Sequence, residues 1–564
     1  MKASTLRYLG VVCITVCAFV VSSCSSLPRA GRPLPFDVKA PVNAPIELVA
    51  GGPQEDTTPE RLVQDFLLAC AAGTSDYFAT ARLFLTQGSA QKWDPTAHVQ
   101  IFATDSSPQV SLKEAENMDK TKVVVGAAAL ASLDDTGVLK RAEGSSVSNT
   151  YTLVKEKGQW RIDSPPDGIL MSQAAFMASY SRASLYFPAH AGDILVSDPR
   201  WYPTRRLASY LLDGLVQGPR ADLESVVTNA VPAGTRLESH SVEVSDGIAK
   251  VQLEGPAPAD AHDQELMQWQ IARTLTGVRT ISSVKISVSG QTFHDFEMPE
   301  DKESAVDSPL VLTAQGIGRL VGGDFRSSPL RGVDPLARAI AVGSTSTSPY
   351  AWVSEGELHI VDSTGETERI VPLDEGCAAD PRISIDRFGW VWSCGSSAGT
   401  LKASHMQDRD VNIPVDVADA GYVRMAAVSA QGSYVVMLRE YEGSVGAWLG
   451  VVVRDRDGMP REIKNVNVID GARTGIEDLS WAGEQTIVAL QRMQRSGVEE
   501  TFLLTVDVGG FTQRSSVSSE AVGITAGSSP FALAVLFKDG TYQLRSGALW
   551  QSLSTDISLL RYPG

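Results

Sequence analysis

The sequence is poor in the residues that build most metal and catalytic sites. It holds 7 histidines and 6 cysteines among 564 residues, with no Cys-x-x-Cys, His-Glu-x-x-His or phosphate-binding P-loop pattern. These absences remove the common sequence signatures of zinc enzymes and P-loop nucleotide hydrolases, so we expect no metal and no cofactor. The histidines are scattered along the chain: His98, His190, His240, His262, His294, His359 and His405.

Positive charge is also in short supply. Lys and Arg number 49 against 66 Asp and Glu, which gives a formal net charge of −17. Loss of Lys2 and Arg7 with an N-terminal signal would make the charge more negative by two. An acidic chain disfavours nucleic acid as a partner and offers no basic face to anionic lipid.

The apolar run near the start of the chain, Tyr8 to Val21, is too short for a permanent membrane anchor. A transmembrane helix needs about 20 apolar residues. Basic residues precede the run, and small residues lead from it into Cys24, an arrangement typical of a secretory signal peptide. Val21-Ser22-Ser23-Cys24 resembles a bacterial lipobox, which implies a signal peptide at 1–23, cleavage before Cys24 and a lipid such as palmitate on its thiol. Lipid on Cys24 would hold the protein on the extracytoplasmic face of the cell membrane.

Three cysteines remain in the mature chain if Cys24 carries lipid. Cys377 and Cys394 bracket one strand-like segment, Ile383 to Trp392, and an exported protein can keep a disulfide there. The alternative is a pair of buried free thiols. Cys70 lies on the apolar side of a predicted helix and is expected in a core.

A length of 564 residues predicts three or four domains, at about 150 residues per domain. Residues 24–56 are rich in Pro, Gly and Ser and predict a flexible spacer. Residues 57–168 begin with Thr58-Pro59, a helix start, and continue with a second helix around 77–85 and then strands. Helices followed by antiparallel strands indicate an α+β domain. This order of elements is similar to that of NTF2-like domains.

Residues 180–292 read as β-α-β-β-α-β. A strand at 184–187 leads through a loop to a helix opening at Pro203, and Asp246-Gly247 predicts the turn of a hairpin. We expect both helices to cover one face of a single sheet. The segments 211–214, 218–219 and 231–235, followed by that hairpin, resemble the GerMN domain of spore germination and envelope lipoproteins.

Residues 308–564 contain short strands that recur every 40 to 53 residues, measured at Ala351, Val391, Val435, Val488 and Ala534. Such spacing is typical of β-propeller blades. The spacing predicts five to seven blades, at least one of them built from early and late strands together.

Two short patterns suggest catalysis and fail on context. Gly395 to Gly399 satisfies G-x-S-x-G around Ser397, yet the nucleophile elbow needs a following helix, and Thr400-Leu401 occupies a predicted strand position. Ser282 and Lys285 fit S-x-x-K at a strand entry, where Lys285 points outward. We therefore expect no catalytic residue and no enzymatic activity.

The order of these parts, a lipobox, an NTF2-like head, a GerMN domain and a propeller, resembles the actinobacterial lipoprotein LpqB family. The resemblance implies a partner, the extracytoplasmic sensor domain of the MtrB histidine kinase of the MtrA-MtrB two-component system. The alternative function is a lipoprotein that binds or processes cell-wall glycan, with sugar held on propeller rims by Trp352, Trp390 and Trp392.

Overall fold

The computed structural model describes residues 50–564 apart from 114–117, 143, 191–193, 240, 295–307, 322–323, 328–331, 344, 346, 418–420, 547–548 and 554–555. The predicted lipidation site Cys24 lies outside the described residues. The described residues belong to one compact unit of the chain. Among their helices, none combines the length and the apolar character needed to cross a bilayer.

The head domain opens with helix α2 (Pro59–Ala72), which begins where the sequence predicts. The Thr58 side chain accepts a hydrogen bond from the Arg61 backbone N–H, and Pro59 occupies the first helical position. One face of the helix is buried against the sheet that follows. Its members are Leu62, Val63, Phe66, Ala69 and Cys70.

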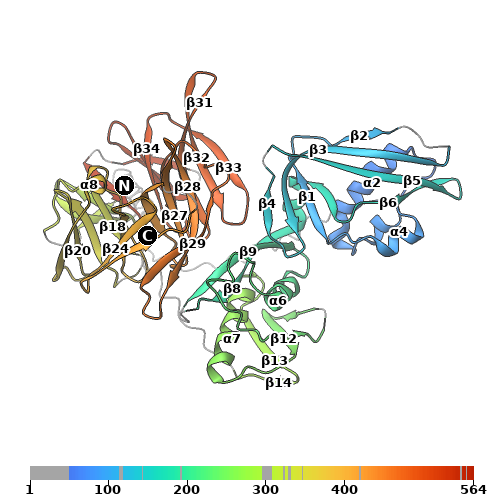
Figure 1. Ribbon diagram of the computed structural model, residues 1–564, viewed down its shortest axis with the longest axis horizontal. Coiled ribbons are helices and arrows are strands. Elements are labelled where there is room, and N and C mark those ends of the chain that lie inside the picture. The colour runs from blue at the N-terminus through green and yellow to red at the C-terminus, as the bar shows by residue number, and fades with distance from the viewer. Residues whose placement is uncertain are drawn as a thin grey trace, which may run out of the picture. The chain divides into compact units, whose positions relative to one another are not determined.

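The head sheet has the order β6-β5-β3-β1-β7, with β2 and β4 also paired to β3 (Figure 1). All pairs are antiparallel except β1 with β7. This α+β arrangement confirms the predicted class. The strands are β1 (His98–Phe102), β2 (Gln109–Leu112), β3 (Lys120–Asp134), β4 (Leu139–Arg141), β5 (Ser146–Glu156), β6 (Gln159–Ser164) and β7 (Ile169–Ser172).

Two details of the head differ from the prediction. The helix expected at 77–85 is reduced to α3 (Ala79–Arg82), followed by α4 (Gln87–Lys92), because Tyr77 and Phe78 adopt φ of 56° and 60°. Positive φ in two successive residues cannot be part of a right-handed helix. The head also continues past residue 168, through β7 and α5 (Gln173–Ser179), which add to its core.

The middle domain begins with a two-stranded antiparallel ribbon, β8 (Tyr180–Pro188) and β9 (Leu195–Pro203). The sequence predicted β8, followed by a loop and then a helix that begins at Pro203. The structure has the strand β9 in place of most of that loop. That prediction was wrong, since helix α6 (Leu207–Gln217) begins only after β9 ends. The sequence of β9 does not indicate a strand, because it contains Asp198, Pro199 and Arg200, and such residues are rare in buried strands.

A second sheet in the middle domain has the order β10-β12-β13-β14, with β11 paired to β12. Its strands are β10 (Arg236–Leu237), β11 (Glu243–Ser245), β12 (Ile248–Glu254), β13 (Ser283–Val288) and β14 (Gln291–Thr292). Asp246 and Gly247, with φ of 51° and 76°, form the predicted hairpin turn. Helix α6 contacts β8, β9 and β10, and α7 (Ala261–Thr276) contacts β8 and β13. The helices therefore contact both the ribbon and the sheet, whereas the sequence predicted a single sheet.

In the described part of the propeller, six sheets have four antiparallel strands each, a number within the predicted range of blades. From the inner to the outer strand, five blades are β18–β21, β22–β25, β26–β29, β30–β33 and β34–β37. The five repeated segments found in the sequence are the second strands of these blades, β19, β23, β27, β31 and β35. In the remaining blade, β15, β16 and β17 pair outward from β38, the last strand of the chain. This closure by early and late strands is as predicted.

The propeller strands vary in length. The blade closed by the last strand consists of β15 (Leu310–Thr313), β16 (Gly316–Val321), β17 (Asp324–Ser327) and β38 (Ile557–Arg561). The next two are β18 (Ala339–Val342), β19 (Tyr350–Ser354), β20 (Glu357–Val361), β21 (Glu368–Pro372), then β22 (Ser384–Ile385), β23 (Val391–Cys394), β24 (Thr400–His405), β25 (Arg409–Pro414). The last three are β26 (Tyr422–Val428), β27 (Tyr434–Tyr441), β28 (Ser444–Arg454), β29 (Pro460–Val468), β30 (Ile476–Trp481), β31 (Thr486–Arg495), β32 (Val498–Asp507), β33 (Thr512–Val517), β34 (Ala521–Ala526), β35 (Ala532–Phe537), β36 (Tyr542–Ser546) and β37 (Leu549–Ser552). A short helix, α8 (Glu375–Ala379), precedes β22.

Candidate functional site

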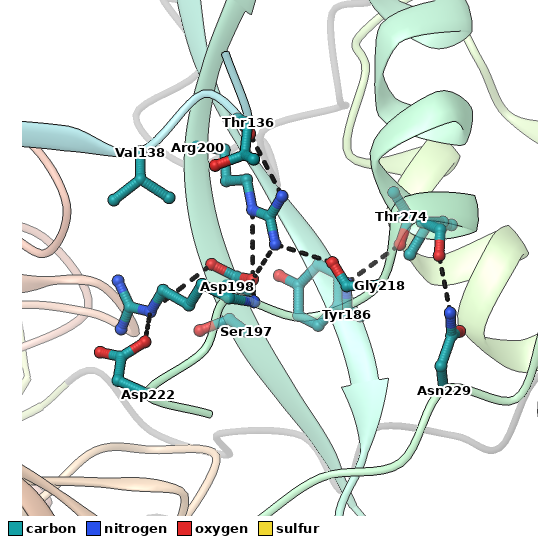
Figure 2. Close-up of polar contacts among 12 residues, drawn as sticks. Thr136, Val138, Tyr186, Ser197, Asp198, Arg200, Gly218, Asp222, Asn229 and Thr274 are labelled. Carbon is teal, nitrogen blue, oxygen red and sulfur yellow. Dashed lines mark hydrogen bonds and ion pairs between the residues drawn. The ribbon is translucent and has the colours of Figure 1, made fainter. Parts of the chain in front are cut away.

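A buried ion pair lies at the centre of β9, between Asp198 and Arg200 (Figure 2). The Arg200 Nη2 donates to Asp198 Oδ2 over 2.7 Å, and the two side chains are 0% and 1% exposed for Asp198 and Arg200. Arg200 also donates to the backbone carbonyls of Thr136 in the head and Gly218 in the middle domain, at 3.1 and 2.9 Å. Burial lowers the pKa of the Arg200 guanidinium, but the neighbouring Asp198 carboxylate raises it by more. The pKa therefore lies above its ordinary value.

Two further groups extend this pair toward the propeller. Arg220 donates its backbone N–H to Asp198 Oδ2 at 3.2 Å, and its guanidinium pairs with Asp222 at 2.8 Å. The Tyr434 hydroxyl, on the propeller strand β27, donates to the Ser197 carbonyl at 2.6 Å. The strand β9 is thus hydrogen-bonded to the head, to its own domain and to the propeller. We call Asp198, Arg200, Arg220 and Tyr434 the junction cluster.

The ribbon makes further contacts with the propeller on one face. Trp201 Nε1 and Arg182 Nη1 donate to the carbonyls of Gly509 and Val508, at 2.9 and 3.0 Å. Gln485 donates to Ser184 Oγ at 2.6 Å. The propeller residues in these contacts lie in connections between inner and second strands or between third and outer strands. We call the face formed by those connections the ribbon face.

The centre of the propeller is closed. The inner strands β18, β22, β26, β30, β34 and β38 neighbour one another in a ring. The space between them is about 30 Å³, lined in part by Trp481 and by the final residues Pro563 and Gly564. The Gly564 backbone N–H donates to the Val342 carbonyl at 3.1 Å. Such a space accommodates about one water molecule, so it is no ligand channel.

The opposite face of the propeller, which we call the open face, carries a polar groove. It is formed by the connections between second and third strands and between successive blades. The groove encloses about 560 Å³ and is lined by Arg382, Arg424 and Arg492 with carboxylates between them. Each arginine is paired: Arg382 with Asp478 at 2.8 Å, Arg492 and Arg424 with the carboxylates of Glu477 and Glu440. The groove is therefore polar but close to neutral.

Two long hairpins flank this groove. The pairs β27–β28 and β31–β32 have strands of 8 to 11 residues, against 4 to 6 in the second strands β19, β23 and β35. The β31–β32 hairpin extends beyond the neighbouring strands (Figure 1). On and beside the hairpins, Tyr441, Val498 and Tyr422 are 36%, 61% and 60% exposed. Aromatic and arginine side chains of this kind are enriched in protein interfaces.

The two cysteines singled out in the sequence lie together. Cys377, in α8, and Cys394, at the end of β23, form a disulfide with Cα atoms 5.8 Å apart. The segment between them is not one strand: β22 and β23 occupy its ends, with a turn held by Asp386. Cys70 is a buried free thiol in the head, and its burial raises the thiol pKa.

We predict that this disulfide stabilises the propeller. Closing a loop of 17 residues is expected to contribute about 3 kcal/mol to the free energy of unfolding. Reductant should lower the unfolding midpoint of the wild type and leave that of Cys377→Ser/Cys394→Ser unchanged. Equal sensitivity of the two proteins to reductant in urea denaturation would contradict the prediction.

The hydroxyls of the two serine patterns make only local hydrogen bonds among the described residues. Ser397 lies in the turn between β23 and β24, where its hydroxyl meets that of Thr400 at 3.1 Å. A strand follows it instead of the helix that an elbow requires. Ser282 donates to the Gly247 carbonyl, and Lys285 is exposed on β13. Within the described part of the chain, no group of three or more His, Cys, Asp or Glu side chains is arranged to hold a metal ion.

The tryptophans proposed to hold sugar are core residues. Trp352, Trp390 and Trp392 are 2%, 2% and 0% exposed. Trp392 Nε1 donates to Asp386 Oδ2 at 2.9 Å, and the Trp352 ring stacks on His359. A buried ring offers no face to a glycan, so these residues do not form the sugar-binding rim of the alternative function, and they pack in the core as their place inside strand runs indicates.

Sequence reasoning missed the junction cluster altogether. Asp198 and Arg200 stand two residues apart, and alternation along a strand places both on one side, between apolar residues at 195–196 and 201–202. That pattern was a usable signal. Opposite charges two residues apart between apolar residues can form a buried ion pair in a strand, although each residue taken alone argues for a loop.

Three family models match the chain in sequence order. They are described as "Lipoprotein LpqB, N-terminal domain" at residues 52–177, "Sporulation and spore germination" at 184–293 and "Lipoprotein LpqB beta-propeller domain" at 329–559. A protein named Lipoprotein LpqB from Mycolicibacterium smegmatis is 30% identical over 525 residues, which cover 88% of this chain and 82% of that protein. The chain belongs to the LpqB lipoprotein family.

Other members of the LpqB family align over a similar extent. The Cutibacterium acnes protein is 28% identical, with 92% of each chain covered. Among solved structures, virginiamycin B lyase from Staphylococcus aureus aligns with 44% of the chain and 86% of its own, at 9% identity and a TM-score of 0.29. That score supports no argument. The matched family accounts for the head, the GerMN middle domain and the propeller as one lipoprotein architecture.

Proposed function

We propose that this LpqB-family protein is a non-enzymatic lipoprotein that binds another envelope protein through the open face of its propeller. The observation that carries the proposal is the contrast between the two faces. The ribbon face is in contact with the middle domain, and the centre is closed. The open face presents a groove and exposed side chains at Tyr441, Val498 and Tyr422.

The chemistry of the open face suits a protein partner better than a small charged ligand. The groove arginines are already paired with carboxylates, so they add little net charge to attract an ion. Tyrosine and arginine side chains form the energetic centres of many interfaces. An aliphatic side chain such as Val498 at the tip of a protruding hairpin can insert between side chains of the partner.

We further propose the identity of the partner and the place of binding. The partner is the extracytoplasmic sensor domain of the MtrB histidine kinase, as the resemblance to the LpqB family implies. Lipid on Cys24 anchors the chain to the extracytoplasmic face of the cell membrane, beside that domain. To modulate signalling, the protein must bind one state of the sensor more tightly than the other.

Binding of the purified sensor domain tests this proposal. Val498→Asp is expected to weaken binding about tenfold or more, because the interface would then bury an unpaired carboxylate. Leu549→Asp is the matched control: Leu549 is 77% exposed on the outer strand β37. Biolayer interferometry should show the loss for Val498→Asp alone. Equal losses for both variants, or no binding by the wild type, would overturn the proposal.

A further inference from the structure

A cavity of about 570 Å³ lies between the head and the middle domain. Its walls come from the turn before α3, the end of β3, the strand β9 and the helix α6. Ligand pockets commonly have such volumes and lie where domains meet, with aromatic walls and a few polar groups. The aromatic side chains of this cavity are Tyr77, Phe78, Tyr180, Trp201, Tyr202 and Tyr210.

Strained backbone holds one wall of the cavity in place. Tyr77 and Phe78 both adopt positive φ, which is unfavourable for residues with bulky side chains. The Phe78 N–H donates to the Gly73 carbonyl at 2.8 Å, and a Cβ at position 73 would lie 2.1 Å from the Phe78 ring. Strain of this kind costs about 1–3 kcal/mol per residue and concentrates at ligand sites. Here the turn leaves the Tyr77 side chain 63% exposed at the cavity.

A third residue with positive φ contacts Tyr77 from the middle domain. Arg206, just before α6, has φ of 61°, and its Nη1 donates to the Tyr77 hydroxyl at 3.0 Å. Its guanidinium also lies 5.8 Å from the centre of the Tyr77 ring. Arg206 therefore holds the Tyr77 side chain in place beside the cavity. Tyr202 and Tyr210 stack with their ring centres 6.2 Å apart.

The polar lining of the cavity has an excess of negative charge. Four carboxylates line it, those of Asp94, Asp134, Asp135 and Asp213, of which Asp134 pairs with Lys140 at 3.4 Å. Hydrogen bonds from Thr96 lower the pKa of Asp94, so this group is ionised at neutral pH. The two arginines of the lining are occupied elsewhere. Arg82 donates to the Trp93 carbonyl at 3.1 Å, and Arg236 pairs with Glu254.

We propose that this cavity binds an organic cation, a ligand with an amine or guanidinium group on an apolar body. Aromatic faces attract cations through their quadrupole, and the carboxylates add attraction of the same sign. The apolar body would pack against the aromatic walls. The site is separate from the open face of the propeller and does not depend on the proposed partner.

Ligand-observed NMR on the full mature chain in detergent tests the proposal with three probes. Phenethylguanidine is the cation, phenethylurea its neutral analogue of the same shape, and tetra-N-acetylchitotetraose a neutral saccharide. We expect the guanidine to bind about tenfold more tightly than the urea, the ratio that a desolvated cation at aromatic rings supports. Equal binding of guanidine and urea, tighter binding of the saccharide, or no binding of any probe would overturn it.

Variants locate the binding. Asp135→Asn with Asp213→Asn is expected to weaken guanidine binding about tenfold while leaving urea binding unchanged, since only the charge is removed. Glu265→Gln, an exposed carboxylate on α7 away from the cavity lining, is the matched control. Tyr77→Ala should weaken both probes. A loss as large for Glu265→Gln as for the aspartate pair would contradict the placement in the cavity. Val498→Asp should leave guanidine binding unchanged, so this test is independent of the test of the proposed partner.

Discussion

Replacing Arg200 with methionine is expected to lower the free energy of unfolding by about 3–5 kcal/mol. The substitution leaves Asp198 buried and charged without its main partner. It also removes the donors to the carbonyls of Thr136 and Gly218, which join β9 to the head and to α6. Urea denaturation followed by tryptophan fluorescence measures the loss, because Trp201 lies next to the substituted residue on β9.

Two matched variants make this result specific. Arg236→Met removes an exposed pair, with Arg236 and Glu254 74% and 41% exposed, and should cost less than about 1 kcal/mol. Asp198→Leu together with Arg200→Met removes both buried charges and should cost less than Arg200→Met alone. If Arg200→Met proves no more destabilising than Arg236→Met, the junction cluster does not stabilise the ribbon.

Replacing Cys24 with alanine is expected to move most of the protein from the membrane fraction to the soluble fraction. Acyl chains contribute about 0.8 kcal/mol per buried CH₂, so a protein without the proposed lipid on Cys24 should lose its membrane anchor. Among the described helices, none could replace it by crossing the bilayer. Ultracentrifugation of cell lysates and incorporation of labelled palmitate measure the two effects.

Cys70→Ala is the control for this substitution. Cys70 is buried in the core of the head, where acylation cannot reach it. This variant should still take up palmitate and sediment with membranes. A Cys24→Ala protein that is exported, sediments fully and still carries label would show that the anchor lies elsewhere.

Local chemistry made much of the fold predictable. The Thr58 cap, the Asp246-Gly247 turn and the second strands of five blades all follow from nearby residues. Asp and Gly are favoured in this turn because both of its central residues must adopt positive φ. Strands of a propeller recur at a regular spacing because each blade is one repeated unit.

Long-range pairing made the rest unpredictable. The strand β9 is stable because Thr136 and Tyr434 satisfy its polar groups, and both lie far from it in the sequence. Without those partners, Asp198 and Arg200 argue for a loop. The groove on the open face has the same origin, since its side chains come from several blades that only closure brings together. The disulfide pairing was predictable because only two cysteines fell in one repeat.

Site-specific photo-cross-linking in living cells tests the central claim, that a partner binds the open face of the propeller. A photoreactive amino acid at Val498 should capture the MtrB sensor kinase, identified by mass spectrometry. The same group at Leu549, which is 77% exposed on an outer strand against 61% for Val498, should not. Capture of the kinase from Leu549 and none from Val498 would contradict the account.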